Sequence, residues 1–216
     1  MADLLEKLGE FGIVPVVKIE DVKDAVGLGR ALIAGGLPCA EITFRTPAAE
    51  GALRRISSSL TEIILGAGTV LSVDQAKRAV HAGARFIVSP GFNQDVVEWC
   101  LKNDVPVTPG VVTPTEISMA LGYDLHVLKF FPAEAMGGIA TLKAIGGPYG
   151  NVKFIPTGGI NRHNLGSYLA QPMVHCCGGS WLVSASLVSA GEFDEITRLA
   201  KEAVSIVRSV RQGREV

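Results

Sequence analysis

A lysine stands in an otherwise apolar run of the sequence, where the residues from His126 to Glu134 read His-Val-Leu-Lys-Phe-Phe-Pro-Ala-Glu and Lys129 lies near the middle. The flanking residues predict a short buried strand. Apolar surroundings disfavour the charged form of an amine, and a neutral amine attacks the carbon of a ketone. Two other interpretations of this segment alone stay open: the side chain reaches water along its stem, or it pairs with a buried acid.

A second polar run starts at Glu41 and reads Glu-Ile-Thr-Phe-Arg-Thr-Pro. Side chains alternate between the two faces of a strand, so Glu41, Thr43 and Arg45 are predicted to share one face. The same alternation groups Lys129 with Phe131. Glu41 and Lys129 are therefore predicted to meet inside the fold, as acid or base and nucleophile. The alternatives are an outward-facing pair of Glu41 with Arg45 and a structural salt bridge of Glu41 with Lys129.

Two glycine pairs follow apolar runs late in the sequence. They are Gly158-Gly159 and Gly178-Gly179, and Ser180 comes directly after the second pair. Each pair is predicted to open a helix and to offer backbone N–H groups to an anion, with added positive potential from the helix N-terminus. Either pair alone is also compatible with a tight turn that binds nothing.

These residues must be positioned by strands that alternate with helices. Segments with helical spacing, such as 22–33 and 73–80, separate short β-branched runs. Continuous apolar strands between helices predict an α/β fold with a parallel sheet, and eight of them predict closure into a (β/α)8 TIM barrel, preceded by a short N-terminal helix. A doubly wound open sheet is the alternative, but no glycine-rich dinucleotide turn follows the first run. The runs are 13–19, 39–44, 62–65, 85–89, 105–108, 126–130, 152–157 and 173–177.

Helix boundary signals agree with this pattern. Ser72 with Gln75 three residues later is typical of a helix start, and so are the segments 46–47 and 113–116. Glycines at 35–36, 83 and 122 are predicted to end helices. No linker or low-complexity tract interrupts the chain, so residues 1–216 are predicted to form a single domain.

The composition excludes several classes of function. The 216 residues are 48% hydrophobic, which is compatible with one barrel-sized core. Lys and Arg number 20 against 21 Asp and Glu, so no overall field favours nucleic acid or an anionic membrane surface. The charged start of the chain and the lack of a long apolar run predict a cytoplasmic protein.

Cysteine and histidine spacing predicts neither a metal site nor a cofactor. The histidines are scattered, and the cysteines have no CxxC spacing and resemble small hydrophobic residues in a reducing compartment. The cysteines are Cys39, Cys100, Cys176 and Cys177.

Taken together, the motifs resemble those of the 2-keto-3-deoxy-6-phosphogluconate (KDPG) and 4-hydroxy-2-oxoglutarate (KHG) aldolase family over about residues 13–203. The segments that carry the resemblance are 41–46, 66–70, 89–91, 129–134, 156–159 and 178–181. The resemblance implies a class I aldolase with a (β/α)8 barrel, usually a homotrimer, that needs no metal.

The resemblance also assigns roles to individual residues. Lys129 matches the Schiff-base lysine and Glu41 the general acid or base. Arg45 and Thr69 match positions that hold the pyruvate carboxylate, although Thr69 is equally suited to a turn or cap. Lys18 stands where some relatives carry arginine, which puts a substrate contact there in doubt. The phosphate cradle is matched by Gly158, Gly159, Gly179 and Ser180, and further substrate contacts are expected at Pro90, Phe131 and Thr157.

The implied substrate is a small phosphorylated 2-keto acid. The expected reaction is cleavage of 2-dehydro-3-deoxy-6-phosphogluconate to pyruvate and glyceraldehyde 3-phosphate, with 4-hydroxy-2-oxoglutarate as a second substrate that gives pyruvate and glyoxylate. Two alternatives are an aldolase for the galactonate epimer and a phosphate-binding barrel that is not an aldolase.

Overall fold

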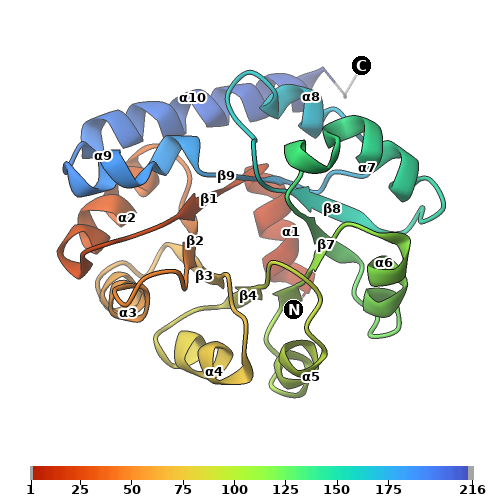
Figure 1. The fold of residues 1–216 in the computed structure, drawn as a ribbon. Coiled ribbons are helices and arrows are strands. Elements are labelled where there is room, and N and C mark those ends of the chain that lie inside the picture. The colour runs from red at the N-terminus through yellow and green to blue at the C-terminus, as the bar shows by residue number, and fades with distance from the viewer. Residues whose placement is uncertain (1, 214–216) are drawn as a thin grey trace.

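The computed structural model describes residues 2–213 of the chain, and in it parallel strands alternate with helices that lie outside them (Figure 1). Six strands form one sheet in the order β5-β4-β3-β2-β1-β9, and three form another in the order β6-β7-β8. All of the paired strands run parallel. The bounds are β1 Ile13–Val17, β2 Cys39–Thr43, β3 Ile64–Gly68, β4 Phe86–Val88, β5 Val107–Thr108, β6 Gly110–Val111, β7 Val127–Phe130, β8 Lys153–Pro156 and β9 Cys177–Gly179.

The two sheets approach each other at both ends. Only Pro109 separates β5 from β6, and a proline interrupts a ladder because it has no N–H group to donate. Isolated parallel bridges join Phe154 to Val174 and Thr157 to Gly178, next to β8 and β9. The predicted α/β fold with parallel strands is confirmed.

Helices follow most of the strands. The 3-10 helices are η1 Val22–Asp24, η2 Glu134–Met136 and η3 Trp181–Val183. The α-helices are α1 Ala2–Phe11, α2 Ala25–Ala34, α3 Ala49–Ser59, α4 Val73–His81, α5 Gln94–Lys102, α6 Pro114–Leu121, α7 Gly138–Gly146, α8 Leu165–Leu169, α9 Ala185–Ser189 and α10 Phe193–Gln212. The predicted short N-terminal helix is confirmed as α1.

Side-chain caps begin α4 and α6 as predicted. The Ser72 hydroxyl accepts a hydrogen bond from the Gln75 N–H, and Thr113 and Glu116 form a reciprocal capping box. The helix start predicted at 46–47 was placed too early, because α3 begins at Ala49. The Thr46 hydroxyl instead donates to the Ile19 carbonyl at 2.5 Å, which connects the chain after β2 to the chain after β1.

Glycine-containing strands account for the differences from the predicted runs. β3 and β9 extend over glycines beyond the β-branched runs, and β6 lies beyond the predicted run 105–108. A Cβ atom on Gly66 would collide with the Phe86 ring, and one on Gly178 would collide with the Thr157 hydroxyl. Gly110 likewise packs against the backbone of Pro90. These strands contain glycine because a neighbouring group occupies the space of the side chain.

The hydrophobic core has two parts. The larger part packs the helices against the outer face of the strands. The smaller part lies on the inner face, where Leu4 and Leu8 of α1 contact residues early in the strands, such as Cys39 and Ile64. Leu8 is 1% exposed, and full burial of a leucine contributes about 1.5–3 kcal/mol. Helix α1 therefore covers the end of the sheets where the strands begin, and it leaves the opposite end for the candidate site.

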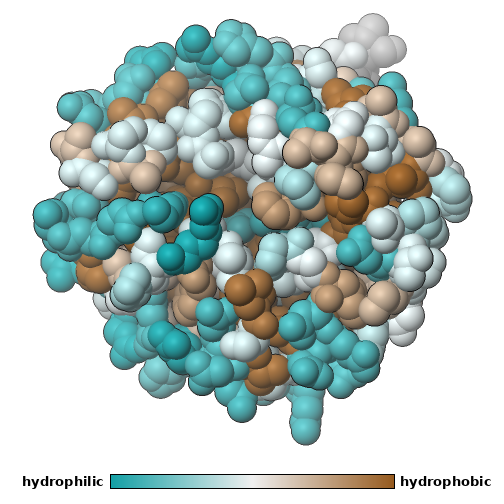
Figure 2. Space-filling view, in the orientation of Figure 1, coloured by the Kyte–Doolittle hydropathy of each residue, from teal (hydrophilic) through white to brown (hydrophobic). Residues whose placement is uncertain are grey.

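Hydrophilic side chains cover much of the outer helices in the face that Figure 2 shows. On α10, Arg198 pairs with Glu195 and Glu202 across successive turns. Among residues 2–213, no helix is both long enough and apolar enough to cross a membrane.

Candidate active site

Lys129 and Glu41 meet in the interior, although they come from β7 and β2 of different sheets. The Lys129 Nζ atom lies 3.4 Å from Glu41 Oε1, and the two residues are 5% and 4% exposed. Lys129 pairs in register with Gly110 on one side and Ile155 on the other, which holds its backbone in the ladder. The predicted meeting of the two side chains is confirmed, and the interpretation of Glu41 as half of an outward-facing pair is wrong.

Neighbouring small and aromatic residues shape the space around this pair. A Cβ atom on Gly68 would collide with the Glu41 carboxylate, so the glycine of β3 makes room for it. The Phe131 ring centroid lies 5.0 Å from Lys129 Nζ. A ring at that distance attracts an ammonium group through its quadrupole. The amine therefore has one charged and one aromatic neighbour, and the other buried polar side chains of the described residues carry only neutral hydroxyls: Thr43, Ser89, Thr108 and Thr157.

Because both side chains are buried, a Lys129–Glu41 salt bridge that served only to stabilise the fold would carry a large desolvation cost. Removing each ion from water costs several kcal/mol, and a single contact at 3.4 Å recovers only part of it. The pair is suited to proton transfer, since the carboxylate lies close enough to take a proton from the ammonium group and leave a neutral amine. This chemistry is what a nucleophilic lysine requires.

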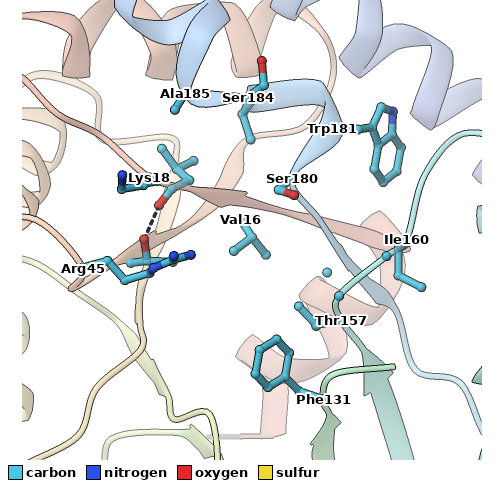
Figure 3. Close-up of a pocket in the computed structure, with 16 residues that line it drawn as sticks. Val16, Lys18, Arg45, Phe131, Thr157, Ile160, Ser180, Trp181, Ser184 and Ala185 are labelled. Atoms are coloured by element: carbon cyan, nitrogen blue, oxygen red, sulfur yellow. Dashed lines mark hydrogen bonds between the residues drawn. The ribbon is translucent and has the colours of Figure 1, made fainter. Parts of the chain in front are cut away.

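A cavity of about 460 Å³ opens at the end of the strands, and Phe131 connects it to the pair, because the Phe131 ring both lines the cavity and lies 5.0 Å from Lys129 Nζ. Lys129 and Glu41 themselves are not in the described lining. Figure 3 shows Arg45 and Lys18 on one side of the cavity and Ser180 and Thr157 on the other. The predicted site residues that line it are Arg45, Phe131, Thr157, Gly158, Gly159 and Ser180. The volume is in the range of small-molecule sites.

Besides Lys129 and Glu41, three predicted site residues lie outside the described lining of this cavity. Thr69 follows β3 and has a φ of +56°, a conformation that non-glycine residues seldom adopt. Pro90 lines a separate cavity of about 210 Å³ between the chain after β3 and the chain after β4. Gly179 lies within β9, where a Cβ atom would collide with the Trp181 ring. Their proposed contacts with a substrate stay predictions.

The two glycine pairs differ in structure. Gly158 and Gly159 form a loop with φ values of +96° and +83°, which glycine adopts without strain. The prediction that each pair opens a helix is wrong, because α8 starts only at Leu165, η3 starts only at Trp181, and Gly178 and Gly179 lie inside β9. A strand is possible there because neither glycine carries a side chain into the space of its neighbours, and Ser180 is the exposed residue that follows.

Two cavity residues were missed or left in doubt by the sequence analysis. Lys18 lines the cavity, and its Nζ lies 2.5 Å from Glu20 Oε1. Strand alternation from Val16 would have indicated this position. Ser184 also lines the cavity while its hydroxyl accepts a hydrogen bond from the Leu187 N–H at 3.4 Å. Ser184 is the cap residue of α9, and a serine before a helical segment is a sequence signal for a helix start at this end of the strands.

The cysteines are buried free thiols, as predicted. Burial raises the pKa of Cys100 and Cys176 to about 12 and also raises the pKa of Cys39 and Cys177, so these groups stay protonated at neutral pH. Within the part of the chain that the structure describes, no three His, Cys, Asp or Glu side chains are grouped to hold a metal ion.

Comparisons with known proteins agree on one group. The family profile described as KDPG and KHG aldolase matches residues 4–199. The 2-dehydro-3-deoxy-phosphogluconate aldolase of Treponema pallidum (strain Nichols) is 49% identical over 207 residues, 96% of this chain and 99% of that protein. The KHG/KDPG aldolase of Escherichia coli (strain K12) is 44% identical over 192 residues, 89% of this chain and 90% of that protein. A crystal structure of the KDPG aldolase from Legionella pneumophila, with pyruvate captured at low pH as a covalent carbinolamine intermediate, has a TM-score of 0.86 at 41% identity, covering 89% of this chain and 93% of that one.

Proposed function

The chain belongs to the KDPG and KHG aldolase family, and we propose that it is a class I aldolase that cleaves 2-dehydro-3-deoxy-6-phosphogluconate to pyruvate and glyceraldehyde 3-phosphate. As an aldolase it is a lyase. The observation that carries the proposed mechanism is the buried contact of Lys129 with Glu41 beside the cavity. A smaller keto acid, 4-hydroxy-2-oxoglutarate, is the proposed second substrate.

The first step forms a covalent bond between the enzyme and the substrate. The neutral amine of Lys129 adds to C2 of the keto acid, and a proton reaches the former carbonyl oxygen to give a carbinolamine. Loss of water then leaves an iminium ion. Glu41 is the proposed proton carrier for these transfers, because its carboxylate is next to the amine and is shielded from bulk water.

The second step breaks the carbon–carbon bond. Glu41, directly or through a water molecule, takes the proton of the C4 hydroxyl while the C3–C4 electron pair moves toward the iminium nitrogen. An enamine forms and glyceraldehyde 3-phosphate leaves. Protonation of the enamine carbon restores the iminium, and its hydrolysis releases pyruvate and the free Lys129 amine.

The two ends of the substrate are assigned to opposite sides of the cavity. Arg45 suits the carboxylate because a guanidinium offers paired N–H donors, with Thr69 as an additional proposed donor. The phosphate is assigned to Gly158, Gly159, Gly179 and Ser180. The separation of Arg45 from Ser180 in Figure 3 supports this orientation.

We also propose that residues 1–216 form one domain in which all strands close into a (β/α)8 barrel. Two observations support closure of the barrel. Thr157 forms a parallel bridge with Gly178, and a single residue, Pro109, separates β5 from β6. A homotrimer and a cytoplasmic location stay predictions that rest on the family resemblance and the composition. Sedimentation of the purified protein tests the trimer.

Trapping with pyruvate tests the Schiff base. Borohydride added with pyruvate is expected to inactivate the enzyme and to increase its mass by one reduced pyruvate adduct, because hydride reduces the iminium on Lys129. EDTA alone is expected to leave activity intact. Loss of activity on chelation that zinc or magnesium restores would overturn this mechanism.

A negative charge introduced at position 180 tests where the phosphate of the substrate binds. Ser180→Asp is expected to raise the KM for the phosphorylated keto acid roughly ten- to a hundredfold, the effect of losing about 1.5–3 kcal/mol of charge-assisted hydrogen bonding and adding repulsion. The unphosphorylated 4-hydroxy-2-oxoglutarate is the internal control, because it has no phosphate to repel. Equal changes for both substrates would place the phosphate elsewhere.

A further inference from the structure

The loop after β8 turns its carbonyl groups away from the cavity. The carbonyl oxygen of Thr157 accepts a hydrogen bond from the Ala133 N–H at 2.8 Å, and that of Gly158 accepts one from the Glu134 N–H at 3.1 Å. Both donors belong to the segment that follows β7. The segment that follows Lys129 therefore fixes the backbone of this loop through hydrogen bonds to its carbonyl groups.

The next peptide group follows the same pattern. The carbonyl oxygen of Gly159 accepts hydrogen bonds from the side-chain amides of Asn161 and Asn164, each at 3.1 Å. In a trans peptide the N–H of the next residue points opposite to the carbonyl. The N–H groups of residues 158–160 thus point away from these donors, and all three residues line the cavity. Such a set of N–H groups attracts an anion.

A hydrogen bond between Glu134 and Tyr168 lies next to the loop of residues 158–160, on the side of the hydrophobic core. Tyr168 is fully buried on α8, and its hydroxyl donates to the Glu134 carboxylate. Burial, and then this hydrogen bond, raise the pKa of Tyr168, so the hydroxyl stays a donor. A Cβ atom on Gly159 would lie 2.5 Å from the Cβ and Cγ atoms of Glu134. The loop therefore rests directly on the Glu134 stem, whose conformation is held by the tyrosine.

We propose that Glu134 and Tyr168 are positioning residues for the phosphate-binding loop. The pair connects the hydrophobic core to the loop without entering the cavity. The ring of Tyr168 packs in the core, and the aliphatic stem of Glu134 packs against Gly159 and so fixes the position of its backbone. This inference rests on the proposed function, since it concerns the phosphate end of the same site.

The pair is expected to control binding of the phosphate and not the chemistry at C2. Lys129 is held by its own ladder partners on β6 and β8, and Glu41 lies on β2. Loss of the Tyr168–Glu134 bond frees the Glu134 side chain to change conformation, and the N–H groups of the loop then lose their shared direction. The measurable result is a change in KM for phosphorylated substrates with little change in kcat.

Three variants test the proposal. Tyr168→Phe and Glu134→Ala remove the hydrogen bond, whereas Glu134→Gln keeps the stem and an acceptor oxygen. The first two are expected to raise the KM for 2-dehydro-3-deoxy-6-phosphogluconate roughly three- to tenfold, the effect of one hydrogen bond, with kcat nearly unchanged. Glu134→Gln is expected to stay near wild type, and none of the three should change kcat/KM for 4-hydroxy-2-oxoglutarate.

Calorimetric titration with inorganic phosphate separates this inference from the proposed function, because it needs no turnover. Weaker phosphate binding by Tyr168→Phe and Glu134→Ala, but not by Glu134→Gln, supports the positioning role even if the wild type cleaves no keto acid. Equal phosphate affinity in all four proteins, or equal KM changes for the two keto acids, would overturn it. Glu134 is exposed, so Glu134→Ala provides the test if Tyr168→Phe does not fold.

Discussion

Replacing Lys129 with methionine is expected to lower the rate of keto acid cleavage by roughly 10⁴-fold or more, the scale on which removal of a catalytic nucleophile acts. Methionine matches the apolar stem of lysine in this buried position but supplies no amine, so no iminium forms to accept the C3–C4 electron pair. The measurements are the steady-state cleavage rate and the mass of the protein after borohydride treatment with pyruvate. Neither cleavage nor an adduct should remain.

Lys18 provides the matched control for this experiment. Lys18 is in the described lining of the 460 Å³ cavity, whereas Lys129 is buried behind Phe131, and the Lys18 amine is partly exposed and paired with Glu20. Lys18→Met should still form the pyruvate adduct. An adduct that persists in Lys129→Met and disappears in Lys18→Met would move the Schiff base to Lys18.

Lys129→Met should also have a lower free energy of unfolding than the wild type. Methionine leaves the Glu41 carboxylate buried without its cationic neighbour, and breaking a buried pair in this way costs about 3–5 kcal/mol. A double variant, Lys129→Met with Glu41→Gln, removes both charges and should recover part of that loss. Chemical unfolding of the single and double variants measures the difference and shows that lost activity is not lost folding.

Replacing Glu41 with glutamine is expected to slow cleavage by roughly 10²–10⁴-fold, the contribution of a positioned acid or base. The amide keeps the size of the side chain beside Gly68 but cannot take up the C4 hydroxyl proton. The pyruvate adduct on Lys129 should still be trapped, though more slowly. Exchange of the pyruvate methyl protons with deuterated water should fall together with cleavage, because both need a proton carrier at the enamine.

Glu20→Gln is the matched control for loss of a carboxylate near the site. Glu20 pairs with Lys18 and not with Lys129, so this variant should exchange the methyl protons close to the wild-type rate. Exchange at the wild-type rate in Glu41→Gln would instead exclude Glu41 as the proton carrier and would direct attention to a water molecule held by Thr157.

Local patterns in the sequence were sufficient for the alternation of strands and helices, for two helix caps and for the faces of the strands that carry the candidate site. The caps at Ser72 and Thr113 depend on residues three positions apart, so they were legible without the fold. Alternation along a strand is equally local. It correctly grouped Thr43 with Arg45 and placed both at the cavity.

Glycine positions were harder to interpret because their meaning depends on neighbours that are distant in the chain. Gly66 is in a strand because the Phe86 ring fills its side-chain space, and Gly178 is in a strand beside Thr157. A glycine pair in the sequence does not distinguish this arrangement from the loop at Gly158. The same limit applies to cavity lining, where Pro90 proved to face a different cavity.

The sequence by itself determined that Lys129 and Glu41 are polar residues on otherwise apolar strands, and which face of its strand each occupies. Only the tertiary structure decided that the two faces meet, 88 residues apart in the chain. The physical reason is that alternation has a period of two residues and acts within one strand, whereas the meeting requires the curvature of two sheets and the small residues between them. Gly68 provides that space beside the Glu41 carboxylate, and the space exists only once β3 has paired with β2.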